Sequence, residues 1–169
     1  MHELSHAIIA RREGIEVLEI LLHPFGGLAR LRREPDTPGA EFRIAIAGPI
    51  ASFVIALIFL GLWAATGTLN KNAVTPLLLW LFFLNLLIAV FNLFPGYPLD
   101  GGRVLRAFLW RRGMNLNEAT ILAGKFGQVI AVVLIVFGIS IMLVSRDVTT
   151  GLWTIVVGIF LFDAAYGII

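Results

Sequence analysis

Long uncharged stretches separated by short polar segments dominate the chain. A helix needs about 20 predominantly apolar residues to cross a bilayer. Four stretches have no charged side chain and approach or exceed this length: 44–66, 72–99, 126–145 and 148–162. Pro95 and Pro98 should end the second helix near Phe94, because proline cannot continue a helix, and the fourth should run on past Asp163. The pattern predicts four transmembrane helices.

The segment between the start of the chain and the first of these stretches has a different pattern. β-Branched residues alternate with others, and a Gly-Gly pair and later Pro and Gly residues follow, which favours a short β-hairpin near residues 15–33. "AIIARR" after the opening residues is compatible with helix. We therefore predict an all-α polytopic membrane protein with four full transmembrane helices, a partial N-terminal helix and this hairpin, forming a single transmembrane domain over 1–169.

Composition supports a membrane protein and narrows the chemistry. Apolar residues make up 59% of the 169 residues and charged residues 14%, with a mean hydropathy of +0.91. A soluble domain carries about 25% charged residues. Because the chain has no cysteine, disulfides and thiolate metal sites are excluded. No basic run is interleaved with aromatic residues, so we do not expect nucleic acid as a partner. The apolar composition makes the lipid bilayer the expected partner.

The basic residues predict the orientation of the spans. If the four stretches cross the membrane in turn, eleven of the thirteen Lys and Arg residues fall on one side: Arg11, Arg12, Arg30, Arg32, Arg33, Arg43, Arg103, Arg106, Arg111, Arg112 and Lys125. Only Lys71 and Arg146 fall on the other. By the positive-inside rule the first side is cytoplasmic. We expect a multi-pass protein of the cell membrane.

The chain opens with the sequence His-Glu-x-x-His. His2 and His6 are four residues apart and would share one face of a helix, where two imidazoles can bind one zinc ion. Glu3 lies beside them and could take a proton from zinc-bound water. The alternative is a partly buried helix with two unrelated histidines, because three fixed positions often match by chance. His23 is the remaining histidine. It could be a third ligand, but a lone histidine in a loop is more often a polar residue at an interface.

A carboxylate near the membrane boundary is the candidate for a third ligand. Asp100 follows the long uncharged stretch in "FNLFPGYPLDGG", where the prolines break the helix. An ionisable residue in that setting is a functional candidate. Two histidines and one carboxylate leave zinc an open position for water. The alternative is that Asp100 is the N-cap of the helix that carries Arg103 and Arg106.

"HELSH" together with "NLFPGYPLDGG" resembles the site-2 protease family of intramembrane zinc metalloproteases, in its prokaryotic six-span form. "LLHPFGGLARLRREPDTPGAEFRIAIAGPIASF" and "GKFGQVIAVVLIVFG" also resemble segments of that family, so the resemblance covers essentially the whole chain. The family pairs the His-Glu-x-x-His sequence with N-x-x-P-x-x-P-(L/M)-D-G-G further along. This resemblance favours a bacterial or archaeal source.

The resemblance implies a role for each matching residue. His2, His6 and Asp100 correspond to the ligands of one zinc ion per chain, and Glu3 to the catalytic acid–base. Asn92 corresponds to an Asn that steadies the substrate backbone or the developing oxyanion; a hydrogen bond to nearby backbone is the alternative. The glycines of the hairpin, Gly26 and Gly27, match an element thought to receive extended substrate by strand addition, and Gly48 and Pro49 match one that serves packing.

The function implied is hydrolysis of peptide bonds in or near the transmembrane segments of membrane-tethered substrates, which is regulated intramembrane proteolysis. The substrate implied is a membrane protein with a transmembrane helix. The sequence does not identify a regulatory protein. Family members carry apolar segments before the first motif, so the chain is expected to be truncated at its N-terminus. The alternatives are a non-catalytic remnant or scaffold of the same fold, and a small transporter or channel with Asp100 as a polar gate.

Overall fold

The computed structural model describes residues 1–23, 26–66 and 74–167. It divides into two compact units, Met1–Leu93 and Phe94–Ile169, which are described in turn. Four of its helices are long and apolar enough to cross a membrane: Pro38–Thr66, Val74–Asn92, Leu116–Ser145 and Val148–Tyr166. The predicted spans and the predominantly helical fold class are thus confirmed, and the single domain over 1–169 stays a prediction.

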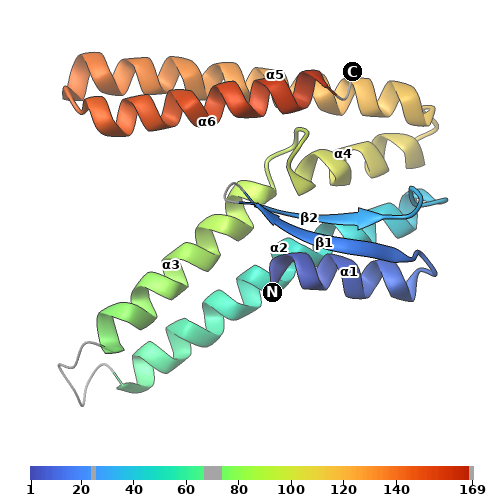
Figure 1. Cartoon of the computed structure of the whole chain (residues 1–169), viewed down its shortest axis with the longest axis horizontal. Coiled ribbons are helices and arrows are strands. Elements are labelled where there is room, and N and C mark those ends of the chain that lie inside the picture. The colour runs from blue at the N-terminus through green and yellow to red at the C-terminus, as the bar shows by residue number, and fades with distance from the viewer. Residues whose placement is uncertain (24–25, 67–73, 168–169) are drawn as a thin grey trace. The chain divides into compact units, whose positions relative to one another are not determined.

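The described residues of the first unit form three helices and a hairpin (Figure 1): α1 (His2–Arg12), β1 (Val17–His23), β2 (Gly26–Leu31), α2 (Pro38–Thr66) and α3 (Val74–Asn92). The two strands pair antiparallel, from Val17 opposite Leu31 to His23 opposite Gly26, with an irregularity near Glu19. The hairpin expected near residues 15–33 is therefore present. Gly26 and Gly27 lie at the start of β2.

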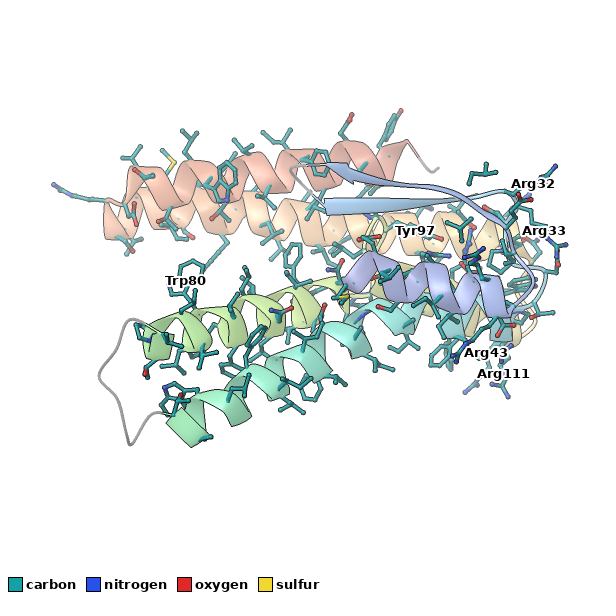
Figure 2. The ribbon with its side chains drawn as sticks, turned by 60° about the horizontal axis from the view of Figure 1, so that its bottom comes forward. Arg32, Arg33, Arg43, Trp80, Tyr97 and Arg111 are labelled. Carbon is teal, nitrogen blue, oxygen red and sulfur yellow. The ribbon has the colours of Figure 1, made fainter. Side chains whose placement is uncertain are left out.

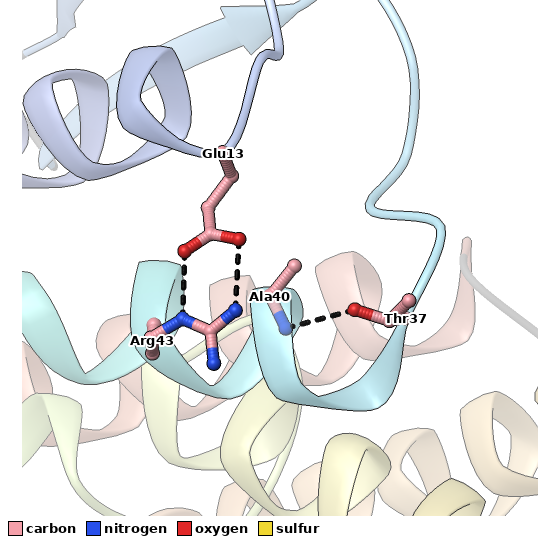
Figure 3. A network of polar contacts seen from close by, with 4 residues as sticks. All are labelled: Glu13, Thr37, Ala40 and Arg43. Carbon is pink, nitrogen blue, oxygen red and sulfur yellow. Dashed lines mark hydrogen bonds and ion pairs between the residues drawn. The ribbon is translucent and has the colours of Figure 1, made fainter.

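Helix α2 begins six residues before the uncharged stretch that predicted it. The backbone N–H of Ala40 donates to Thr37 Oγ1 at 3.2 Å (Figure 3), and Pro38 occupies the first helical position, where a missing N–H costs nothing. This start adds a polar first turn to the span. Pro49 lies inside the helix, where it removes one backbone donor.

Helix α1 is held to α2 by apolar packing and by one ion pair. Ala10, Ile15 and Ile44 form a fully buried cluster. At the end of α1, Arg43 Nε donates to Glu13 Oε1 at 2.6 Å and its Nη2 donates to Oε2 at 2.8 Å (Figure 3). The two parallel bonds fix both the position and the direction of the Arg43 guanidinium relative to the Glu13 carboxylate. They lower the pKa of the Glu13 carboxyl below its ordinary value.

Glu13→Gln is expected to lower the thermal unfolding midpoint modestly at neutral pH. The folded carboxyl has the lower pKa, so its contribution is present above the ordinary pKa of a glutamate and is lost as the pH falls through the folded pKa. The difference between the variant and the unaltered protein should therefore vanish in acid. Unfolding curves measured across this pH range check it, with Glu118→Gln as the control. A difference that is constant with pH would contradict it.

The second unit contains three helices and a short π-helical turn: α4 (Asp100–Arg111), α5 (Leu116–Ser140), the turn Ile141–Ser145 and α6 (Val148–Tyr166). Asn115 caps α5 by accepting from the Glu118 N–H at 2.8 Å, and Asp147 caps α6 by accepting from the Thr150 N–H at 3.1 Å. Helices α5 and α6 form a long hairpin (Figure 1), and Gly138 and Gly151 allow their backbones to approach closely.

Exposed side chains and charge fit a membrane setting. Large apolar side chains such as Trp80, Phe83 and Leu87 are more than 60% exposed on α3, which suits contact with lipid better than contact with water. Within the first unit, Arg32, Arg33 and Arg43 lie at the end opposite Trp80 (Figure 2). The charge asymmetry of the sequence is thus present along this unit, and the cytoplasmic orientation stays a prediction.

Candidate metal centre

The two histidines of the opening motif lie together on helix α1. Their ring centres are 4.9 Å apart and their planes nearly perpendicular, at 78°. One ring nitrogen of His2 and one of His6 lie within 4.8 Å of each other. His6 is only 5% exposed, and His2 is half-buried. The predicted shared face is therefore confirmed, because one helical turn separates the two residues.

Each ring has its Nδ1 atom against helix α2. His6 Nδ1 lies 2.6 Å from the carbonyl oxygen of Ile44, and His2 Nδ1 lies 2.9 Å from Ser52 Oγ. A carbonyl only accepts hydrogen bonds, so His6 Nδ1 donates and carries the ring hydrogen. In the neutral ring, the lone pair suited to a metal is then on Nε2. A partner on the non-ligating nitrogen is the usual support for a metal-binding histidine.

The Nε2 atoms of both rings lie beside Gly48. Any side chain at this position would place its Cβ 2.6 Å from His2 Nε2 and closer still to His6 Nε2. Since real Cβ atoms do not approach other atoms this closely, only glycine at position 48 lets α2 pass this close to the two nitrogens. Two imidazole nitrogens that converge on one point suit a divalent metal ion.

Glu3 is half-buried in the first turn of α1, directly after His2. Because Glu3 and the two histidines belong to the same helix, Glu3 lies beside the histidine pair. Its role as an acid–base stays a prediction.

Asp100 belongs to the second unit and is the first residue of α4. The N-cap position is taken by Leu99, so the interpretation of Asp100 as the N-cap is wrong. Gly102 packs directly on the backbone of Gly96 and Tyr97, a close approach that the absence of a side chain allows.

The loop before Asp100 is fixed to helix α5. The Tyr97 N–H donates to the carbonyl of Ala123 at 3.1 Å, and a Cβ on Gly96 would lie 2.5 Å from the Gly127 nitrogen. The Arg106 side chain, 6% exposed, lies 5.5 Å from the centre of the Tyr97 ring and donates to Thr120 Oγ1 at 3.4 Å. These contacts hold the chain entering α4 in one place, which a ligand residue at its first position needs.

Asn92 ends helix α3, and its Nδ2 donates to the carbonyl of Ile88 at 2.9 Å. This is the hydrogen bond to nearby backbone that the alternative interpretation expected. It occupies one of the two amide hydrogens, so the predicted role toward substrate stays open for the rest of the group. His23 is the last residue of β1, and its side chain lies outside the described residues.

Comparison with protein families matches residues 1–68 and 62–136 to the description "Peptidase family M50". The chain belongs to peptidase family M50. A solved structure, "Site-2 Protease from Methanocaldococcus jannaschii", is 34% identical to this chain. The two superpose with a TM-score of 0.75 over 99% of this chain and 71% of that one. The resemblance to the site-2 protease family is thereby confirmed.

Relatives of the M50 chain have names that state a chemistry. "Putative zinc metalloprotease Rip3" of Mycobacterium tuberculosis is 44% identical over 97% of this chain and 42% of its own length. "Zinc metalloprotease MJ0392" of Methanocaldococcus jannaschii is 39% identical over 82% of this chain and 40% of its own length. The M50 chain therefore spans less than half of the length of these two relatives.

Sequence reasoning did not identify the α2 partners of the histidines in the M50 chain. The sequence does not single out Ser52, and the resemblance assigns Gly48 to packing rather than to chemistry. A signal existed in their spacing: Ile44, Gly48 and Ser52 are four residues apart and so share one face of α2, as His2 and His6 share one face of α1.

Proposed function

We propose that the protein is a zinc-dependent endopeptidase that hydrolyses peptide bonds in or near the transmembrane segments of membrane proteins. The observation that carries the proposal is the histidine pair, with His6 Nδ1 donating to the Ile44 carbonyl and both Nε2 atoms beside Gly48. Membership of peptidase family M50 and the names of the relatives support the same chemistry.

His2 and His6 would hold the zinc ion through Nε2, and Asp100 would supply the third ligand. When bound, zinc polarises the scissile carbonyl and lowers the pKa of a coordinated water toward neutrality. Glu3, next to His2 on α1, accepts a proton from the attacking water and delivers it to the leaving amine. Asn92 steadies the substrate backbone with the part of its amide not bonded to Ile88.

The substrate follows from the setting of the site. The motif helix α1 packs on α2, which is long and apolar enough to span the membrane, so the peptide to be cut reaches the site in or beside the bilayer. A helical substrate shields its own carbonyls and must unwind before hydrolysis. The hairpin of β1 and β2, with Gly26 and Gly27, offers backbone partners to the unwound segment. The arginine-rich end faces the cytoplasm.

A reconstitution assay tests the proposal. The protein is incorporated into liposomes with a panel of tagged single-span membrane proteins, and products are followed by gel. We expect cleavage of at least one substrate, loss of cleavage after zinc is removed with phenanthroline, and recovery when zinc is restored. Cleavage that persists without metal would contradict a zinc enzyme. If the protein neither binds zinc nor forms product, the result would favour the non-catalytic remnant.

A further inference from the structure

We propose that one face of helix α2 orients the histidine pair, with Ser52 as a positioning residue for His2, the Ile44 carbonyl holding His6 and Gly48 keeping the metal space open. This inference rests on the proposed function, because it concerns the same metal. It assigns a task in metal binding to a segment that otherwise serves only to pack α1 against α2.

The geometry of the two helices brings the three α2 positions into register with the pair. His2 pairs with Ser52, and His6, later in α1, pairs with Ile44, earlier in α2, so the helices run antiparallel where they touch. The two histidines are four residues apart on α1, which is about 6 Å of helix rise. Their partners, Ile44 and Ser52, are eight residues apart on α2, which is about 12 Å. The two Nδ1 atoms are therefore drawn apart, and the Nε2 atoms converge on Gly48, midway between the partners.

Ser52 has the chemistry to set the ring of His2. Its hydroxyl accepts as well as donates, so it can accept from Nδ1–H and leave the lone pair on Nε2. Ser52 is 2% exposed, so water has little room to replace the hydroxyl. Loss of such a partner typically costs 10–100-fold in metal affinity. Without it, the ring would keep neither its orientation nor its tautomer.

Gly48 supplies the second requirement, which is space. The histidine rings are the ends of side chains, but hydrogen bonds at Nδ1 hold both, so they cannot move away from an added Cβ without breaking those bonds. Gly61 on the same helix is a matched control, because a Cβ there would meet nothing within 4 Å. Ser140, whose hydroxyl donates to the Phe137 carbonyl of its own helix at 2.7 Å, is a matched control for Ser52.

The test measures zinc affinity in the purified protein, independently of cleavage. Metal-free protein is titrated with zinc against a chromophoric chelator, and the rise in the thermal unfolding midpoint on adding zinc is recorded. We expect Ser52→Ala to raise the zinc dissociation constant about 10- to 100-fold and Gly48→Ala at least as much. The zinc-dependent rise in the midpoint should shrink in both. Ser140→Ala and Gly61→Ala should match the unaltered protein.

The possible outcomes separate this inference from the proposed function. If the unaltered protein binds zinc and Ser52→Ala binds it equally well, with the same zinc-dependent rise, the positioning role is overturned even if the metal-free variant is less stable. If Gly48→Ala binds like Gly61→Ala, the role of the open space is overturned. If the unaltered protein binds no zinc, both the inference and the proposed function are overturned.

Discussion

Replacing Glu3 by Gln is expected to reduce cleavage by about 10²- to 10⁴-fold, the range that general acid–base catalysis contributes. The amide has nearly the shape of the carboxylate but cannot accept the proton of the attacking water. Because Glu3 is not a proposed ligand, the variant should bind zinc as the unaltered protein does. Cleavage rate and zinc content, measured on the same preparation, check this expectation.

The control for this substitution is Glu118→Gln, which alters an exposed glutamate in the first turn of α5. It should leave cleavage unchanged. Full activity in Glu3→Gln would show that another group takes the proton, and the mechanism proposed for α1 would have to be abandoned. Loss of both zinc and activity would instead assign Glu3 to the metal site.

Removing the carboxylate of Asp100 is expected to raise the zinc dissociation constant by more than about 100-fold and to abolish cleavage. The reason is that loss of a ligand should cost more than the 10–100-fold associated with loss of a residue that only orients a ligand. Asp100→Ala removes the ligand, whereas Asp100→Asn keeps its shape and removes the charge. Chelator competition and the cleavage assay measure both effects.

Asp163→Asn is the matched control for Asp100, since it neutralises an exposed aspartate in the second unit on helix α6. It should preserve zinc affinity and cleavage. The same zinc affinity in Asp100→Ala and the unaltered protein would exclude Asp100 as a ligand. The third position would then have to be supplied by another group, and the pairing of the two sequence motifs would have no role in metal binding.

The sequence by itself determined the features that depend on local periodicity and composition. Uncharged stretches predicted the four membrane-length helices, because crossing a bilayer requires an apolar run of fixed length. The spacing of His2 and His6 predicted a shared face, because one helical turn separates them. The alternation and glycines near residues 15–33 predicted the hairpin. Helix starts were missed where polar caps such as Thr37 and Asn115 extend a helix beyond its apolar stretch.

Only the tertiary structure decided how the histidine rings are held. His2 and Ser52 are 50 residues apart and His6 and Ile44 are 38 apart, so no local pattern pairs them. The partner of His6 is a backbone carbonyl, which every residue has and no sequence motif marks. The need for glycine at position 48 likewise arises from the approach of α1 to α2, since a side chain is excluded there by atoms distant in the chain.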